Sequence, residues 1–367
     1  LMWNSTGLGT LGRMAIYKTT ANPYELAVAD SHVTVIRPLK QFVLPEYLYY
    51  YFANPSVQSV IEDQADGTTK QKELATATIK AYLTPIPPLD EQRRILAKLS
   101  EVLPVVKNYG VVYDETTAMQ EAFPESLKKS ILQEAVQGKL VPQDPSGEPA
   151  EALLERIRAE KQRLIKEGKI KKDKHESVIF RRDNSHYEKL DGVERCIDDE
   201  LPFEIPENWC WVRFGTAITL LSGTDFAPDE YNSAGKGIAY ITGASNIVDS
   251  QIHVNRWTET PRQITHAGDI LLVCKGSGYG KTVICNIEQA HIARQIMAVQ
   301  KFNLLDMLYI KLFLDSSFDL LKTKGQGVIP GIDRTSVLHL LFPLPPLNEQ
   351  HRIVQRIEEL LPLVKGM

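Results

Sequence analysis

The chain has little of what marks a secreted or membrane protein. Its 367 residues contain four cysteines, with no CxxC pair and no histidine cluster near them: Cys196, Cys210, Cys274 and Cys285. We expect buried, reduced thiols, with neither disulfides nor a metal site. No apolar run approaches the roughly eighteen residues of a membrane span, and no basic segment followed by an apolar one opens the chain. The sequence therefore predicts a cytoplasmic protein with no membrane partner.

An excess of positive charge is also absent. The net charge is −4, whereas a protein that coats nucleic acid without regard to sequence usually carries a basic domain. The densest basic stretch, residues 156–182, is predicted to be a solvated helix end and linker, with a strip of phosphate contacts as the alternative. Any contact with DNA must therefore be local.

What the chain does have is apolar content, length and an internal repeat. A hydrophobic fraction of 43% is ample for cores, and 367 residues predict two to three domains. Residues 85–107 (PIPPLDEQRRILAKLSEVLPVVK) recur at 343–365 (PLPPLNEQHRIVQRIEELLPLVK), with 13 of 23 positions identical. A period this long is not that of a solenoid. It indicates two domain-sized units, each followed by the same helix.

The repeat continues upstream of both helices. Three segments match in order, the first pair with one residue deleted: 7–16 with 276–284, 32–37 with 295–300, and 48–52 with 308–312. The first copy starts where the second is already at about Leu271, and the chain ends before a counterpart of residues 110–138. We expect one whole unit and one truncated unit, with self-association as a hypothesis because open strand edges and apolar surface invite a partner.

Each repeated helix has a predicted start and a predicted interruption. The Pro-Pro-Leu run cannot be helical, so Asp90 and Asn348 are expected as N-caps. Pro104 and Pro362 should kink or break the helices at the same level. Two apolar stripes should bury each other in an antiparallel pair: Ile95, Leu99, Leu103 and Val106 with Ile353, Ile357, Leu361 and Val364.

The rest of the chain predicts a mixed α and β fold (α+β). A second helical stretch runs from about 114 to 136 with Gly138 as its stop, and 150–172 should form a helix that is polar and basic on most faces. Residues 174–201 are predicted to be an irregular linker, and Trp209 and Trp211 to lie in the core. Apolar runs indicate strands at 237–242, 269–274, 282–287 and 295–301, followed by helices at about 304–322 and 333–341.

Three motifs resemble the specificity subunit of type I restriction-modification systems. They are both copies of PxPPLxEQxRI, the segment 130–143 (SILQEAVQGKLVPQ), and the phrase IPENW at 205–209. The resemblance covers nearly the whole chain. It implies strand-rich target-recognition domains, each reading one half of a split DNA sequence, joined by long conserved helices that pack as an antiparallel pair, set the gap between half-sites and dock methyltransferase subunits.

This resemblance implies four parts and a set of partners. The parts are 1–84, the C-terminal part of a first target-recognition domain; 85–195, the central helical region and linker; 196–342, a second target-recognition domain; and 343–367, the start of a distal helix. The partners are double-stranded DNA, methyltransferase subunits and, through the complex, restriction subunits. No cofactor is expected on this chain, because S-adenosylmethionine, magnesium and ATP belong to the partner subunits.

The glycine-rich segment 275–282 (KGSGYGKT) is the main candidate site. A phosphate-binding P-loop needs glycine at position 275, which is lysine, and a strand is predicted where its helix would begin. We therefore expect a hairpin tip of the recognition fold, with a purely structural turn as the alternative. Basic and aromatic groups on such a tip suit phosphate and base contacts. The predicted DNA-contacting residues are Lys275, Gly276, Ser277, Tyr279, Lys281, Thr242, Ser245, Asn246, Arg294, Gln295, Gln326 and Arg13.

For Ser245 and Asn246, capping of a turn is the favoured alternative. No catalytic residue is predicted, because the sequence contains no recognisable nuclease or helicase motif. Residues 22–24 (Asn-Pro-Tyr) match an amino-methyltransferase tetrapeptide only in part. The sequence thus predicts a noncatalytic DNA-recognition and scaffold subunit. The alternatives are a fused restriction nuclease and a truncated assembly protein that does not bind DNA.

Overall fold

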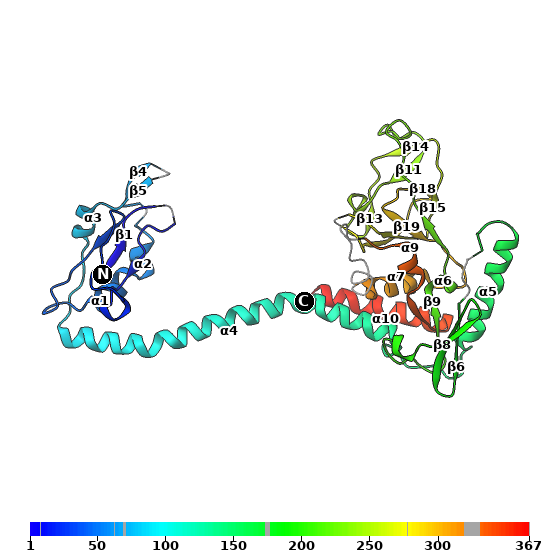
Figure 1. Ribbon diagram of the computed structural model, residues 1–367, viewed down its shortest axis with the longest axis horizontal. Helices are drawn as coiled ribbons and strands as arrows, with labels where there is room; N and C mark the ends of the chain where they lie inside the picture. The colour runs from blue at the N-terminus through cyan, green and yellow to red at the C-terminus, as the bar shows by residue number, and fades with distance from the viewer. Residues whose placement is uncertain are drawn as a thin grey trace. The chain divides into compact units, whose positions relative to one another are not determined.

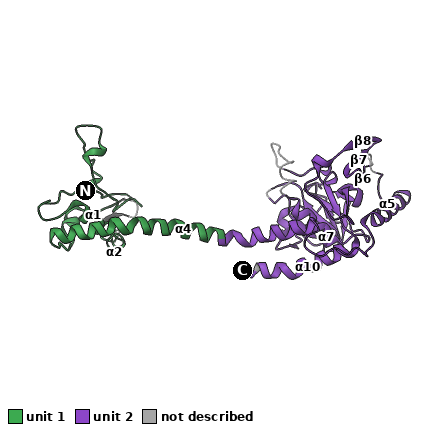
Figure 2. Cartoon of the chain, turned by 90° about the horizontal axis from the view of Figure 1, so that it is seen from below, with its two compact units in different colours: residues 1–119 green, residues 120–367 purple. Residues whose placement is uncertain are grey.

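The computed structural model (Figure 1) describes residues 1–366 apart from residues 8, 62, 69–70, 173–176, 277 and 319–330. The chain forms two compact units, Leu1–Met119 (unit 1) and Gln120–Met367 (unit 2), coloured separately in Figure 2. The 48-residue helix α4 (Leu89–Val136) contributes to both. The predicted class, a mixed α and β fold with long helices, is confirmed.

Unit 1 is a small antiparallel sheet with short helices packed against it. Its strands lie in the order β2 (Met14–Ala15), β1 (Met2–Asn4), β3 (Val33–Val35). Its other elements are η1 (Thr19–Ala21), α1 (Pro45–Phe52), α2 (Pro55–Gln58), α3 (Thr76–Ala81) and the hairpin of β4 (Asp66–Thr68) and β5 (Gln71–Glu73). The buried Trp3 packs on Phe52, with 4.9 Å between ring centroids, and Ile95 of α4 joins this core. Apolar burial therefore ties the start of α4 to the sheet.

Two four-stranded sheets form the body of unit 2. The first has the order β10 (Leu220–Ser222), β19 (Ile296–Val299), β16 (Ile270–Val273), β17 (Thr282–Ile284); the second has the order β14 (Trp257–Thr258), β11 (Ile238–Ile241), β18 (Gln289–Ile292), β15 (Ile264–His266). Leu271 and Val273 pack between the sheets, whereas Ile270 and Leu272 face the helices. The first sheet is thus buried on both faces. All four predicted apolar runs contain an observed strand, which confirms them.

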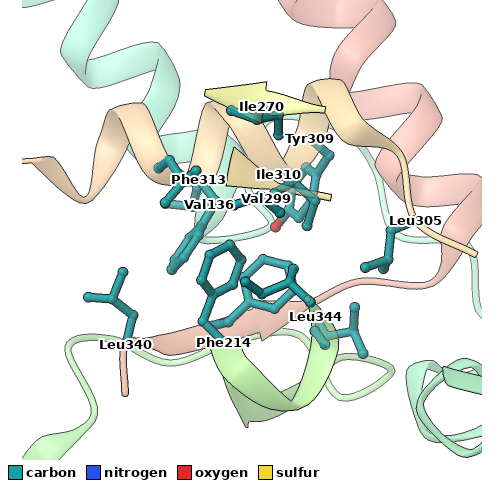
Figure 3. Close-up of a cluster of buried hydrophobic side chains, with 14 of the residues drawn as sticks. Val136, Phe214, Ile270, Val299, Leu305, Tyr309, Ile310, Phe313, Leu340 and Leu344 are labelled. Carbon is teal, nitrogen blue, oxygen red and sulfur yellow. The ribbon is translucent and has the colours of Figure 1, made fainter. Parts of the chain in front are cut away.

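The second core of unit 2 lies on the helical side of the first sheet (Figure 3). Here β9 (Cys210–Arg213) pairs with β20 (Leu341–Leu344), next to α6 (Phe214–Ala217), α7 (Met307–Ser316) and α9 (Arg334–Leu338). Phe214 packs on Phe313 with 5.2 Å between ring centroids. Trp209 and Trp211 are 3% and 2% exposed, which confirms that they belong to the core.

The long helices form an antiparallel pair, but not between the predicted residues. Helix α10 (Leu347–Lys365) lies beside the C-terminal part of α4 and runs in the opposite direction (Figures 1 and 2), with Ile353 and Ile357 in one core with Leu132 of α4. The predicted burial of the 95–106 stripe against the 353–364 stripe is wrong. Ile95 packs in the core of unit 1 and Ile353 and Ile357 pack in that of unit 2, whereas Leu103 and Val106 are 39% and 57% exposed.

Helix α4 is also longer than predicted. It runs without a break through Pro104 and Gly110, and α10 likewise continues through Pro362. Residues 100–109 are exposed, so water can reach the carbonyl of Ser100, which Pro104 deprives of an amide partner. The predicted N-caps are also wrong: α4 begins at Leu89 and α10 at Leu347 with Pro346 as its N-cap, which puts Asp90 and Asn348 inside the first turn.

The predicted linker at 174–201 contains a three-stranded sheet instead. Its strands are β6 (Ser177–Arg182), β7 (Ser185–Leu190) and β8 (Val193–Cys196), followed by η2 (Asp198–Glu200). The turns between them have positive φ at Asp183, Asn184, Asp191 and Gly192. Asp-Asn and Asp-Gly between strand-forming residues are a hairpin signal, so the sequence did carry the evidence for this sheet. The exposed Cys196 at its end corrects the expectation of buried thiols.

The buried carboxylate Glu188 joins this sheet to the body. It accepts two hydrogen bonds from the guanidinium of Arg213 on β9, at 2.8 and 2.7 Å, and others from Arg195 and Ser177 at 2.7 Å each. The bonds from Arg213 are the main cause that lowers the pKa of Glu188 to about 2. This network is charge-assisted, so loss of either partner would leave a buried charge.

The basic helix also differs from its prediction. Helix α5 (Ala150–Lys166) ends before the predicted residue 172, near Gly168, which has a φ of 69°; it is polar on most faces, as predicted, and has one apolar face. Its buried residues are Ala150, Leu153, Leu154 and Ile157. Gly138, with a φ of 72°, ends α4 as predicted.

Candidate nucleic-acid interface

A glycine-rich hairpin has the same backbone geometry in both units. Gly12 and Gly280 have φ values of 83° and 88°, in the region that favours glycine. Equivalent backbone hydrogen bonds surround them: Asn4 N to Arg13 O (2.8 Å) and Val273 N to Lys281 O (2.9 Å), then Ser5 N to His32 O (2.8 Å) and Cys274 N to Gln295 O (2.7 Å). These bonds confirm the alignment predicted for the glycine-rich segment and for the strand that follows His32 and Gln295.

The repeated Glu-Gln pair explains how each body is joined to its helix. Gln92 is buried; its amide accepts from Leu44 N at 2.8 Å and donates to Pro87 O at 2.8 Å. Gln350 is buried in the same way; it accepts from Asp306 N at 3.0 Å and donates to Pro345 O at 3.0 Å. Leu44 and Asp306 are the N-caps of α1 and α7. Each glutamine therefore connects a body helix to the proline run before α4 or α10.

The same comparison corrects one predicted alignment. The hydroxyl of Tyr47 donates to Pro85 O at 2.9 Å, and that of Tyr309 donates to Pro343 O at 3.1 Å. Tyr47 is therefore the counterpart of Tyr309. The predicted match of 48–52 with 308–312 is off by two residues, because similarity of apolar letters could not show which side chain reaches the proline carbonyl.

Three loops of unit 2 meet at one end of the two sheets, called the loop edge: residues 242–246, 274–281 and 293–295. Strands β11 and β18 are parallel, so the loops after Ile241 and Ile292 leave at the same end. Strand β19 is antiparallel to β16, so it begins where β16 ends, at Val273. The topology thus brings together three segments that are far apart in the chain.

Close packing at the loop edge requires small residues. A methyl group at Gly243 would lie 2.6 Å from Oε1 of Gln295, and one at Gly278 would lie 2.3 Å from Cβ of Ala244. Neither position can hold a larger side chain without moving its neighbour. Each of the three loops therefore contacts another, and the loop edge is one surface.

The family model for the type I restriction modification DNA specificity domain matches residues 1–105 and 222–364. The chain belongs to this family. Both matched stretches contain the glycine-rich hairpin and a buried glutamine. In unit 2 the match includes every segment of the loop edge.

The chain is also similar to specificity subunits of type I restriction enzymes. The type I restriction enzyme EcoAI specificity subunit of Escherichia coli is 27% identical over 401 residues, which cover 95% of this chain and 64% of that protein. The EcoEI specificity subunit of Escherichia coli is 26% identical, with 91% and 63% covered. The chain therefore spans just under two thirds of the length of these relatives. The HsdS subunit from Thermoanaerobacter tengcongensis, a crystal structure, aligns with a TM-score of 0.45 and 20% identity over 92% of this chain and 67% of that one.

In this specificity domain the predicted DNA-contacting residues differ in exposure. The exposed ones at the loop edge are Ser245, Lys275, Gly276, Lys281, Arg294 and Gln295. Thr242 and Tyr279 are half-buried, and Asn246 is buried. Arg13 is exposed on the equivalent hairpin of unit 1. Ser277 and Gln326 lie outside the described residues.

Asn246 holds the first loop of the specificity domain together. Its side-chain oxygen accepts from the amide and the hydroxyl of Thr242, both at 2.9 Å. Its side-chain nitrogen donates to His253 O at 2.8 Å and to Asn255 Oδ1 at 3.2 Å. The loop contains η3 (Ala244–Asn246) and leads into the hairpin of β12 (Ile247–Val248) and β13 (Gln251–Ile252). These bonds leave Ser245 as the exposed polar side chain of this loop.

The guanidinium of Arg294 is exposed but directed by a carboxylate. Its Nε lies 3.2 Å from Asp225, whose other oxygen accepts from the Arg294 amide at 3.0 Å. The Arg294 side chain keeps 72% of its surface exposed. The pair therefore fixes where the guanidinium points while leaving donors available.

Sequence reasoning missed Arg256. Its guanidinium carbon lies 5.0 Å from the ring centroid of Tyr231, and its carbonyl accepts from Tyr240 N at 2.8 Å, close to the loop edge. Among the described residues it has no ion pair with a carboxylate. Nothing in the sequence around position 256 distinguishes it, because both the stacking partner and the strand end come from distant segments.

A buried histidine behind the loop edge is part of the structure rather than a ligand. His291 Nδ1 accepts from the amides of Arg262 and Gln263 at 3.2 and 3.1 Å, and Nε2 lies 2.7 Å from Thr224 O. Burial is the main cause that lowers the pKa of His291. Across the described ranges, no group of three or more His, Cys, Asp or Glu residues has a metal-binding arrangement, and no helix has the length and apolar character to cross a membrane.

Proposed function

We propose that this chain is the DNA-recognition subunit of a type I restriction-modification complex and that the loop edge of unit 2 reads one half of a bipartite target. The observation that carries this is the close packing of the three loops, which leaves Lys275, Arg294 and Gln295 exposed on one surface. Arginine and glutamine can make paired hydrogen bonds to guanine and adenine, each worth roughly 1–3 kcal/mol of discrimination. Gly276 and Ser245 contribute backbone and hydroxyl groups to the same surface.

The proposed organisation follows the four parts expected from the sequence. Residues 196–342 are the second target-recognition domain and 1–84 belong to the first, with 85–195 and 343–367 as helical regions. The subunit itself is noncatalytic. It acts in the cytoplasm, where methyltransferase subunits carry S-adenosylmethionine and restriction subunits act through the complex.

The test of DNA reading is selection from a random duplex pool with the purified chain. Arg294→Ala and Lys275→Ala should change the selected sequence and weaken binding to it by roughly 5- to 100-fold, from the same 1–3 kcal/mol per contact. Lys189→Ala, an exposed lysine on β7, is the matched control. Unchanged preference in both loop-edge variants would remove these residues from the reading site, and no selected sequence at all would favour the non-DNA-binding assembly protein.

We also propose that methyltransferase subunits dock on the exposed apolar side of α4. Large apolar residues there alternate at spacings of three and four, with Thr116 filling one position: Val102, Val105, Tyr109, Val112, Met119 and Phe123. This is the spacing of a helix that packs against another helix. All six side chains are at least 38% exposed.

The docking test is co-purification with the cognate methyltransferase subunit. Val105→Asp with Tyr109→Asp should abolish the complex, whereas Asp114→Lys, on the opposite side of the helix, should not. A complex that survives the double substitution would contradict docking at this stripe. A light-scattering mass of two chains that drops to one in the double variant would instead assign the stripe to self-association.

A further inference from the structure

Arg13 and Lys281 occupy the same position in the repeated hairpin. Each follows a glycine of positive φ, and each carbonyl accepts a hydrogen bond from the facing strand. Both side chains are exposed, and neither makes a hydrogen bond or an ion pair with any other residue that the structure describes. The fold therefore does not use these two positive charges.

The rest of the hairpin tip differs between the units. By their hydrogen bonds and β-bridges, Thr6 of unit 1 is the structural counterpart of Lys275 of unit 2. His32 is likewise the counterpart of Gln295. Two readers of different base sets need different side chains at base-contacting positions. What both readers have in common is the phosphate backbone, which carries no sequence information. A basic residue kept at one position of both tips, without a role in the fold, fits that common ligand.

Lys281 also lines a cleft in unit 2 with a volume of about 380 Å³. Its walls come from α4, the turn between β12 and β13, and α7. The charged residues in the lining are four lysines, Lys128, Lys129, Lys281 and Lys311, and three carboxylates, Glu125, Asp249 and Asp315. Positive charge is in excess by one.

Two of these lysines already have acidic neighbours. Lys311 Nζ lies 2.6 Å from Asp315, which is also bonded to the hydroxyl of Thr282. Lys128 Nζ lies 3.8 Å from Glu125, and both are largely exposed, so this pair is weak. An anion in the cleft would therefore meet the positive charge of Lys281 first. Lys128 of α4, whose ion pair is weak, would be a second contact.

We propose that Lys281 binds a backbone phosphate of DNA at this cleft, with Lys128 as a second contact, and that Arg13 makes the equivalent contact in unit 1. The inference rests on the proposed DNA-reading function. It adds that α4 contacts the duplex as well as connecting the two units. It also separates the loop edge into residues that read bases and residues that hold the backbone.

The test is the salt dependence of binding of the full chain to its selected duplex and to random duplex. Each lost phosphate contact should reduce the slope of log K against log salt by about 0.9. Lys281→Gln and Arg13→Gln should each show this reduction and weaken both duplexes by the same factor. Lys128→Gln should shift the slope in the same direction by less, and Lys189→Gln should leave it unchanged. Lys281→Arg should restore the slope, which separates lost charge from altered folding.

The possible results distinguish this inference from the function on which it rests. If the wild-type chain selects a sequence but Lys281→Gln changes that preference at unchanged slope, Lys281 reads bases and the phosphate assignment is overturned. An unchanged slope with unchanged preference overturns it as well. If the wild-type chain selects no sequence, DNA reading itself fails, whatever the variants do.

Discussion

Units 1 and 2 contain the same hairpin and the same buried glutamine, but different surroundings. Behind the hairpin, Gly12 faces the ends of the Gln58 and Ile61 side chains, whereas Gly280 faces the ring of Phe318. The hydrogen bonds that join body to helix are retained in both units, whereas the exposed tip residues differ. The comparison teaches that both copies of the repeat keep the same hairpin backbone but carry different exposed side chains on it.

The largest expected contrast lies in the two glycines. Gly280→Ala should destabilise unit 2 by about 3–4 kcal/mol, because a methyl group at positive φ would also lie 1.6 Å from the Phe318 ring. Gly12→Ala should cost unit 1 only about 1–2 kcal/mol, since its nearest atoms are the side-chain ends of Gln58 and Ile61, at 2.8 and 2.9 Å, and not a ring at 1.6 Å. Hydrogen exchange of the full chain, resolved by unit, measures both. Equal losses would show that the ring moves away at little cost.

The second contrast concerns the buried glutamines. Gln350→Leu should destabilise unit 2 by about 2–3 kcal/mol, because it leaves Asp306 N–H and Pro345 C=O without partners. Gln92→Leu removes a third bond as well, to Phe42 O at 2.9 Å, so unit 1 should lose somewhat more. Denaturant unfolding followed by hydrogen exchange tests this. Neutral substitutions would mean that water replaces the lost bonds.

Acid should weaken unit 2 through the buried carboxylate of Glu188. The pKa of Glu188 is lowered to about 2 in the folded chain, so its contribution is complete above the unfolded value of 4.5 and is lost as pH falls from there through about 2. Because Arg195 is half-exposed, water screens part of the network, and we expect a loss of roughly 2 kcal/mol. Thermal unfolding between pH 6 and 2 measures it.

Glu188→Gln is the matched variant for this experiment. It should destabilise unit 2 at neutral pH, because Arg213 keeps only Glu200 as an acidic partner, and should flatten the acid dependence of unfolding. Wild-type and variant curves that fall in parallel would assign the acid transition to other carboxylates.

The smallest contrast is between the two tyrosines. Tyr309→Phe and Tyr47→Phe each remove one hydrogen bond to a proline carbonyl, which costs about 1 kcal/mol. Burial raises the pKa of both phenols, and that of Tyr309 well above 10. A raised phenol pKa means that stability falls as pH rises above the unfolded value. Raising the pH should therefore destabilise unit 2 more than unit 1, as measured by hydrogen exchange. The loss of stability in unit 2 should be smaller in Tyr309→Phe.

Much of the local structure could be predicted from the sequence. Backbone preferences of single residues predict the turn glycines at positions 276 and 280 and the helix end at Gly138. The two-residue period of apolar residues predicts the strands. The linker sheet was missed although Asp183-Asn184 and Asp191-Gly192 were visible, so that miss was one of interpretation. The aromatic alignment failed because Leu48-Tyr49 matches Leu308-Tyr309 in residue type, whereas the hydrogen bonds make Tyr47 the counterpart of Tyr309.

The candidate site was predictable only in part. Lys275, Arg294 and Gln295 could be chosen as exposed polar residues near predicted strand ends. That Lys275 shares one surface with Arg294 and Gln295 follows from the antiparallel pairing of β16 with β19, which no local pattern specifies. Arg256 could not be found at all, since its significance lies in its distance from Tyr231.

The sequence by itself determined the duplication, the glycine positions of both hairpins, and the arrangement in which each body is followed by the same helix. These features follow from self-similarity and local backbone chemistry. Only the tertiary structure decided which apolar stripe packs where, that Gln92 and Gln350 are buried connectors, and that three distant loops form one edge. Those outcomes depend on contacts between residues far apart in the chain, where geometry and burial, rather than residue type, select the partner.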